Sequence, residues 1–120
     1  MKVLIIDDDA DIRFVAAMSL RAGGGIDVVE ANGGLDGLRK AREQQPDVIL
    51  LDMMMPTMDG SQTIAALRMQ TETATIPVIF LTAKTIVTEI QRMKNLGAAG
   101  VLIKPFDPRT LAADVLALVT

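Results

Sequence analysis

Residues 3–9 read VLIIDDD, four aliphatic side chains followed directly by three aspartates. Continuous aliphatic runs without polar alternation are typical of strands that are covered on both faces of a sheet. Four further runs rich in valine, isoleucine and leucine recur along the chain: Ile26–Val29, Val48–Leu51, Val78–Leu81 and Val101–Ile103. Together with Val3–Ile6, they predict five strands.

The segments between these runs carry apolar residues at helical spacing. The residues predicted to face inward are Ile12, Val15, Ala16 and Met18; Leu35, Leu38 and Ala41; Ile64, Ala65 and Leu67; Ile86, Ile90, Met93 and Leu96; and Leu111, Val115 and Leu118. Five strands alternating with five helices favour an α/β fold, with a parallel sheet between two layers of helices. Right-handed crossovers and the short chain favour a doubly wound, flavodoxin-like sheet of order 2-1-3-4-5.

Turn and capping residues predict where some of the helices begin and end. Gly23–Gly25 is expected to stop the first helix, and Gly97 is expected to follow the fourth. Ser61 is a candidate N-cap of the third helix. The pair Asp107-Pro108 is expected to open the last helix, with aspartate as N-cap and proline at the first helical position.

Composition narrows the possible function classes. The chain has 120 residues, which predicts one domain spanning residues 1–120. It contains no cysteine and no histidine, which excludes disulfides, thiolate or histidine metal sites, and catalytic triads that use histidine. Its net charge of −3 argues against a nucleic-acid partner. The lack of a long apolar stretch and the acidic start predict a cytoplasmic protein with no membrane segment.

Polar residues follow four of the predicted strands at the point where each strand ends. Asp7, Asp8 and Asp9 follow the first strand, Asp52 the third, Thr82-Ala83 the fourth and Lys104-Pro105 the fifth. Ligands of doubly wound sheets bind beyond the carboxyl ends of the strands. These side chains are therefore expected to share one pocket, although Asp9 and Asp11 are assigned to the start of the first helix.

The charges in this pocket do not balance, because Asp7, Asp8 and Asp52 face one ammonium group, that of Lys104. Two like charges about 4 Å apart repel by ~4 kcal/mol at an effective dielectric constant of 20. Either some of the carboxylates take up protons or a divalent cation lies among them. Oxygen ligands suit Mg²⁺, which commonly pairs with phosphate, and a carboxylate beside such an ion can attack phosphorus. The residues alone thus leave two interpretations, protonated carboxylates or a Mg²⁺ site that could support aspartyl phosphate chemistry.

Four stretches together resemble the receiver domain of two-component response regulators, over essentially the whole chain. They are Val3–Arg13, Leu51–Gly60, Pro77–Ala83 and Gly100–Phe106. The resemblance implies a signalling switch that catalyses its own phosphorylation and dephosphorylation, rather than an enzyme acting on metabolites. The phosphoryl donor would be a sensor histidine kinase or a histidine phosphotransfer protein.

The resemblance also implies a magnesium site and a phospho-acceptor. Asp52 would accept the phosphoryl group. Asp7, Asp8 and Asp52 would hold Mg²⁺ together with the backbone carbonyl of Met54. Asp8 is the expected direct ligand, whereas Asp7 can act through a water molecule.

The remaining strand ends would bind the phosphoryl group itself. By resemblance, Lys104 would pair with one phosphate oxygen, while the Thr82 hydroxyl and the Ala83 backbone N–H would donate to others. The Lys104–Pro105 peptide bond is usually cis in the family. The readout surface would comprise the fourth helix, the fifth strand and the fifth helix. A downstream protein, or a second copy in a phosphorylation-dependent dimer, would bind there.

Two positions depart from the common pattern of the family. Val101 occupies a position where many receivers have tyrosine or phenylalanine, so an aromatic switch is not available there. Met54 and Lys84 flank the phosphoryl site at positions that tune water access. The bulky, apolar Met54 is expected to slow the loss of the phosphoryl group.

Three other kinds of protein share part of this pattern. A phosphate-independent pseudo-receiver usually lacks the acceptor, an acidic residue or the lysine, and Asp52, Asp8 and Lys104 are all present. A haloacid-dehalogenase-like phosphatase would share the Asp-x-Asp pattern of residues 7–9, but it needs a longer chain and a cap over its substrate. A flavodoxin-type FMN protein would need a phosphate loop after the first strand and aromatic residues beside the flavin.

Overall fold

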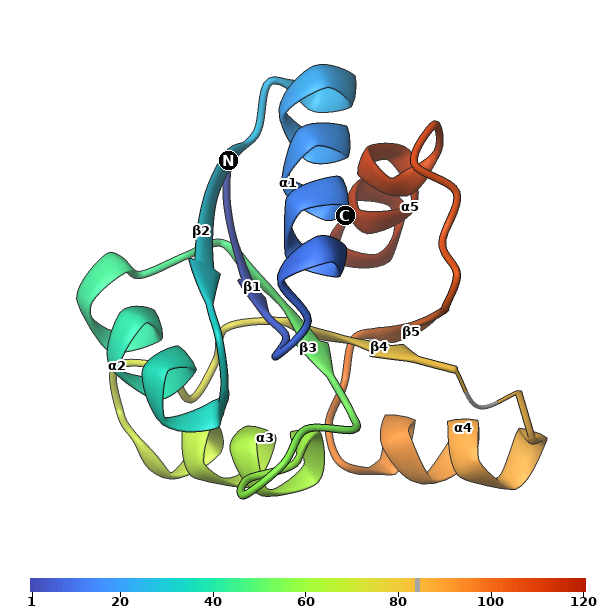
Figure 1. Ribbon diagram of the computed structural model, residues 1–120. Helices are drawn as coiled ribbons and strands as arrows, with labels where there is room; N and C mark the ends of the chain where they lie inside the picture. The colour runs from blue at the N-terminus through green and yellow to red at the C-terminus, as the bar shows by residue number, and fades with distance from the viewer. Residues whose placement is uncertain (84) are drawn as a thin grey trace.

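The computed structural model describes residues 1–83 and 85–120. Its strands are β1 (Lys2–Ile6), β2 (Asp27–Ala31), β3 (Val48–Asp52), β4 (Val78–Thr82) and β5 (Gly100–Ile103). Its helices are α1 (Ala10–Gly24), α2 (Gly34–Gln44), α3 (Gly60–Met69), α4 (Val87–Asn95) and α5 (Leu111–Val119). The strands form one parallel sheet in the order β2-β1-β3-β4-β5 (Figure 1). The predicted flavodoxin-like α/β fold is confirmed.

The sheet lies between two layers of helices. Figure 1 shows α1 and α5 on one face, with α2, α3 and α4 on the other. Successive strand residues point to opposite faces, so Val3 and Ile79 pack under α1 and α5, whereas Leu4 and Phe80 pack against the other three helices. Strands β3 and β4 are buried along their whole length. This double coverage is why Val48–Leu51 and Val78–Leu81 are apolar at every position rather than at alternate ones.

The strand register brings the carboxyl ends of the strands to one edge of the sheet. Ile6 pairs with Leu51 across β1 and β3, and Thr82 pairs with Ile103 across β4 and β5. The backbone N–H of Lys104 then donates to the carbonyl of Thr82 at 2.7 Å. The residues that follow β1, β3, β4 and β5 therefore leave the sheet side by side.

The predicted N-cap of the third helix is wrong by two residues. Helix α3 is capped by Asp59, whose carboxylate accepts a hydrogen bond from the Gln62 backbone N–H at 2.9 Å. The Gln62 side chain accepts from the Asp59 backbone N–H in return, which completes a capping box. Ser61 lies inside the helix, and its hydroxyl donates to Asp59. The reciprocal pair satisfies two backbone donors, which a serine at position 61 could not do.

The predicted start of the last helix is also wrong. Helix α5 begins at Leu111, with Thr110 as its N-cap residue. Asp107 instead accepts from the Arg109 backbone N–H at 2.9 Å and from its guanidinium, within a turn that precedes the helix. The aspartate thus satisfies a backbone donor as predicted, but it does so in a turn.

Several residues predicted to face inward are exposed: Val15, Met18, Leu35, Ala65, Ile86 and Leu118. The buried residues of α1 are Ala16, Ala17, Ser19 and Leu20. Three of them, Ala16, Ala17 and Leu20, lie on the opposite side of the helix from Val15 and Met18. Small alanines let α1 approach the sheet and α5 closely. Helical spacing alone did not distinguish this face from the one that carries larger apolar residues.

Candidate functional site

A cleft of about 260 Å³ lies at the carboxyl edge of the sheet. Its walls are Asp7, Asp8, Asp9, Asp52, Met54, Ala83 and Lys104. These residues come from the ends of β1, β3, β4 and β5, which the strand register places next to one another. The structure thus brings the predicted acidic and basic residues into one pocket.

Three carboxylates converge in this cleft. Asp7 and Asp52 are buried, with exposed fractions of 0% and 4%, whereas Asp8 is exposed. One carboxylate oxygen from each of the three lies within 4.8 Å of the others. Three hard oxygen donors this close together form a donor set that fits Mg²⁺.

Lys104 bridges the two buried carboxylates. Its ammonium donates to Asp7 Oδ2 at 2.8 Å and to Asp52 Oδ1 at 3.1 Å. Burial lowers the pKa of Lys104, but the hydrogen bonds to Asp7 and Asp52 outweigh this and leave the pKa above its ordinary value. The group is therefore a permanent cation at neutral pH. The Lys104–Pro105 peptide bond is cis.

Asp52 carries the clearest electrostatic perturbation in the cleft. Burial, followed by the charge of Asp7, raises the pKa of Asp52 to about 6, although the hydrogen bonds from Lys104 oppose the rise. Its Oδ1 also accepts from the Met54 backbone N–H at 3.3 Å. No residue in the described parts of the chain hydrogen-bonds Oδ2 of Asp52. A carboxylate with one oxygen anchored and the other open to the cleft is suited to nucleophilic attack.

Of the predicted phosphate-binding residues, Ala83 and Lys104 line the cleft, whereas Thr82 is not one of its wall residues. Thr82 ends β4 and is 1% exposed, and Ala83 forms part of the cleft wall. Met54 lines the cleft and is 64% exposed. Val101 is partly buried against the layer of α2, α3 and α4. Lys84, the second residue expected to flank the phosphoryl site, lies outside the described residues.

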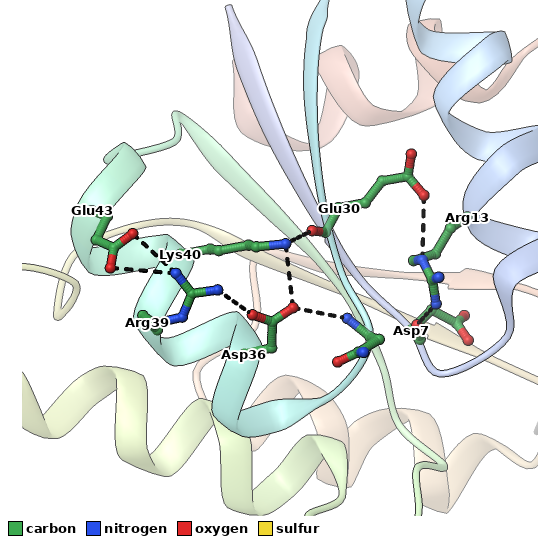
Figure 2. A network of polar contacts seen from close by, with 8 residues as sticks. Asp7, Arg13, Glu30, Asp36, Arg39, Lys40 and Glu43 are labelled. Atoms are coloured by element: carbon green, nitrogen blue, oxygen red, sulfur yellow. Dashed lines mark hydrogen bonds and ion pairs between the residues drawn. The ribbon is translucent and has the colours of Figure 1, made fainter.

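Asp9 and Arg13 lie near the cleft, but neither was predicted to bind the metal ion or the phosphoryl group. Asp9 caps α1 as predicted, accepting from the backbone N–H groups of Asp11 and Ile12. No sequence motif marks Arg13, yet its guanidinium donates to the backbone carbonyl of Asp7 at 2.7 Å and contacts Glu30 (Figure 2). Only the fold brings Glu30 of β2 within reach, so no sequence signal indicated this contact.

A second hollow of about 250 Å³ lies between the start of α2 and residues 56–58. Asp36 is its one ionisable wall residue among those described, and this carboxylate is paired with Arg39 at 2.7 Å and Lys40 at 3.3 Å. Of the two hollows, the first therefore carries more ionisable wall residues than the second.

Comparison with known proteins shows the family. The family model of the response regulator receiver domain matches residues 3–116. The chain belongs to the response regulator receiver family. A receiver domain is a signalling module of two-component systems, and the cleft described above is consistent with a phosphorylation-dependent switch.

Similar proteins include DNA-binding regulators and a chemotaxis protein. The receiver is 39% identical to the DNA-binding dual master transcriptional regulator RpaA of Synechocystis over 98% of the chain and 48% of that protein. It is 35% identical to the DNA-binding response regulator MtrA of Mycobacterium tuberculosis over 97% of the chain and 49% of that protein. The chain therefore spans about half the length of these curated relatives. The chemotaxis response regulator CheY4 of Vibrio cholerae matches with a TM-score of 0.90 at 37% identity, covering 98% and 97% of the two chains.

Proposed function

We propose that this receiver is a phosphorylation-dependent switch that takes a phosphoryl group onto Asp52. The observation that carries the proposal is the buried Asp52 carboxylate, with Lys104 on Oδ1 and Oδ2 open to a cleft that holds two further aspartates. An acceptor needs an ionised, accessible oxygen and nearby positive charge. A pKa of about 6 leaves Asp52 mostly ionised at pH 7 and above.

The transfer exchanges one bond to phosphorus for another. The open oxygen of Asp52 attacks the phosphorus of a phosphohistidine, the phosphorus–nitrogen bond breaks, and the histidine leaves with its electron pair. The Lys104 ammonium stabilises charge on the phosphoryl oxygens from the side of Asp52 to which it is already bonded. The Thr82 hydroxyl and the Ala83 N–H, at the end of β4, donate to the remaining oxygens.

The donor set supports a magnesium ion as the cofactor of this reaction. Asp7, Asp8, Asp52 and the Met54 carbonyl would hold the ion, with Asp8 as the direct ligand. When bound, Mg²⁺ neutralises charge on the carboxylates and on the phosphoryl oxygens. The chain itself holds Asp7 and Asp52 against Lys104, whose positive charge partly compensates the two buried carboxylates when no ion is bound.

The family suggests the partners. We propose a sensor histidine kinase or a histidine phosphotransfer protein as donor. The output would be a downstream protein, or a second copy of the receiver, bound through α4, β5 and α5. The relatives named DNA-binding are about twice as long as this chain, so the acidic receiver itself is proposed not to contact nucleic acid. No helix in the described part of the chain is long and apolar enough to cross a bilayer. A cytoplasmic location remains a proposal.

The test is the intact mass of the protein after incubation with acetyl phosphate, with and without Mg²⁺. We expect one added phosphoryl group that requires Mg²⁺ and is lost in Asp52→Asn. The matched control is Asp27→Asn, which removes an exposed carboxylate at the opposite edge of the sheet and is expected to leave the adduct unchanged. No adduct in a folded sample that also fails to bind beryllofluoride would instead favour the phosphate-independent pseudo-receiver.

A further inference from the structure

A row of charged residues runs from the acidic cleft across β2 to α2 (Figure 2). Arg13 contacts both Asp7 and Glu30, and the Lys40 ammonium donates to the carbonyl of Glu30 and pairs with Asp36. The link nearest the cleft joins three elements, because Arg13 lies in the first turn of α1, Glu30 in β2, and Asp7 directly after β1. Through Asp7, the contacts of Arg13 are the part of this row that can influence the geometry of the cleft.

Arg13 completes the hydrogen bonding of Asp7. The Asp7 N–H donates to Ala31 at 3.1 Å, its Oδ1 accepts from the Asp9 N–H at 2.9 Å, and its Oδ2 accepts from Lys104. The carbonyl is the fourth polar atom, and Arg13 Nη1 donates to it at 2.7 Å. Every polar atom of Asp7 is thus anchored. The loop that carries Asp8 and Asp9 starts from this fixed residue.

The charge of Arg13 does not explain its place. A cation this close to an acidic cluster opposes the binding of a second cation. The guanidinium, however, points at a backbone carbonyl rather than a cleft carboxylate, and Glu30 partly neutralises it at 3.3 Å. The Arg13 side chain is 18% exposed and Asp7 is fully buried, so their contact is sheltered from water, whereas the Glu30 side chain is 39% exposed. The pair therefore supplies a directed hydrogen bond with a small net charge.

We propose that Arg13, oriented by Glu30, is a positioning residue for the Mg²⁺ site. It fixes the loop after β1, and with it the Asp7 and Asp8 carboxylates that would hold Mg²⁺. Groups that orient metal ligands without touching the metal typically change affinity by about 10–100-fold when removed. This inference rests on the magnesium site of the proposed function.

The test measures Mg²⁺ affinity directly, by calorimetric titration of the unphosphorylated protein. We expect Arg13→Gln and Arg13→Lys both to weaken binding about 10-fold, because lysine keeps the charge but cannot span the Asp7 carbonyl and Glu30. The control is Arg21→Gln, which removes the same charge from the same helix. Arg21 is exposed, and its one described side-chain contact is a long hydrogen bond of 3.5 Å to the Val28 carbonyl. The Mg²⁺ affinity of Arg21→Gln is expected to match that of the wild type.

The sign of the change separates positioning from plain electrostatics. If only the charge mattered, Arg13→Gln would tighten Mg²⁺ binding and Arg13→Lys would leave it unchanged, and this pair of results overturns the proposal. A loss of stability in urea with unchanged Mg²⁺ affinity also overturns it, because the role would then be merely structural.

A second variant keeps the test decisive if the Arg13 variants fold poorly. Glu30→Gln leaves Arg13 in place and removes its orienting partner, so a smaller weakening in the same direction is expected. The double variant Glu30→Gln/Arg13→Lys should lose less Mg²⁺ binding free energy than the two single variants lose in sum, as expected for residues that act together. Wild-type protein that binds no Mg²⁺ would overturn the proposed magnesium site itself. Wild-type binding with unaltered variants would overturn only the positioning role.

Discussion

Replacing Asp52 with asparagine is expected to stabilise the fold, and to do so more strongly as the pH rises. Burial and the charge of Asp7 raise the pKa of Asp52 from 3.8 to about 6. Asparagine has nearly the same shape and still accepts a hydrogen bond from Lys104, but it does not ionise. The variant therefore avoids the cost of holding a buried negative charge beside Asp7.

The sign of the pH dependence follows from proton binding. Between about pH 4 and pH 6, folded wild-type protein keeps the Asp52 proton that the unfolded chain has already released. Its free energy of unfolding therefore falls as the pH rises through this window. One pKa unit corresponds to ~1.4 kcal/mol. The free energy of unfolding of Asp52→Asn is therefore expected to exceed that of the wild type by ~3 kcal/mol at pH 8 and by less than ~1 kcal/mol at pH 4.

The assay is urea unfolding of both proteins from pH 4 to pH 8 without divalent cations. Circular dichroism is the signal, because the chain has no tryptophan or tyrosine. Asp27→Asn is the control for loss of one exposed carboxylate. Mg²⁺ is expected to narrow the gap at pH 8, because an ion that binds the native carboxylates stabilises the wild type. If the difference in unfolding free energy between Asp52→Asn and the wild type stays constant with pH, or grows toward pH 4, the raised pKa of Asp52 is refuted as its cause.

Three further changes test the site and its support. Gly60→Ala is expected to lower the free energy of unfolding by ~1–3 kcal/mol, because its Cβ would lie 2.7 Å from two backbone atoms of Asp52–Met53. Gly33→Ala meets nothing within 4 Å and is the matched control; equal urea curves for the two variants would contradict this. Lys104→Ala is expected to cost ~3 kcal/mol at pH 8 in the same assay, because two buried carboxylates lose their cation, and an unchanged midpoint would argue against it. Met54→Asn is expected to speed phosphoryl loss after acetyl phosphate is removed, and an equal or slower rate would show that Met54 does not shield the site.

The aliphatic strands were readable from the sequence because double coverage demands apolar residues at every position. The run Val48–Leu51 has no polar interruption, and the structure buries all of it. The strand limits shifted by one or two residues at the sheet edges, where β2 runs from Asp27 to Ala31 and β5 begins at Gly100. Edge strands are half-exposed, so their polar ends blur the boundary.

The helices were less readable, because a helix offers several faces and the sequence does not say which one meets the sheet. Val15 and Met18 of α1 are exposed, whereas its buried residues include the small Ala16 and Ala17 together with Leu20. The start of α5 was misplaced for a related reason. An Asp-Pro pair suits a turn as well as a helix cap, and the chain uses Asp107 in a turn.

The sequence by itself predicted the sheet order and that Asp7, Asp52 and Lys104 would meet in one cleft, because these residues stand at the carboxyl ends of parallel strands. Only the tertiary structure decided how these groups are poised. The 2.8 Å and 3.1 Å bonds from Lys104, the raised pKa of Asp52 and the hold of Arg13 on Asp7 depend on burial and on side-chain distances. Strand order could be predicted because alternating strands and helices with right-handed crossovers allow few topologies, whereas electrostatic energies vary with distance and solvent exposure.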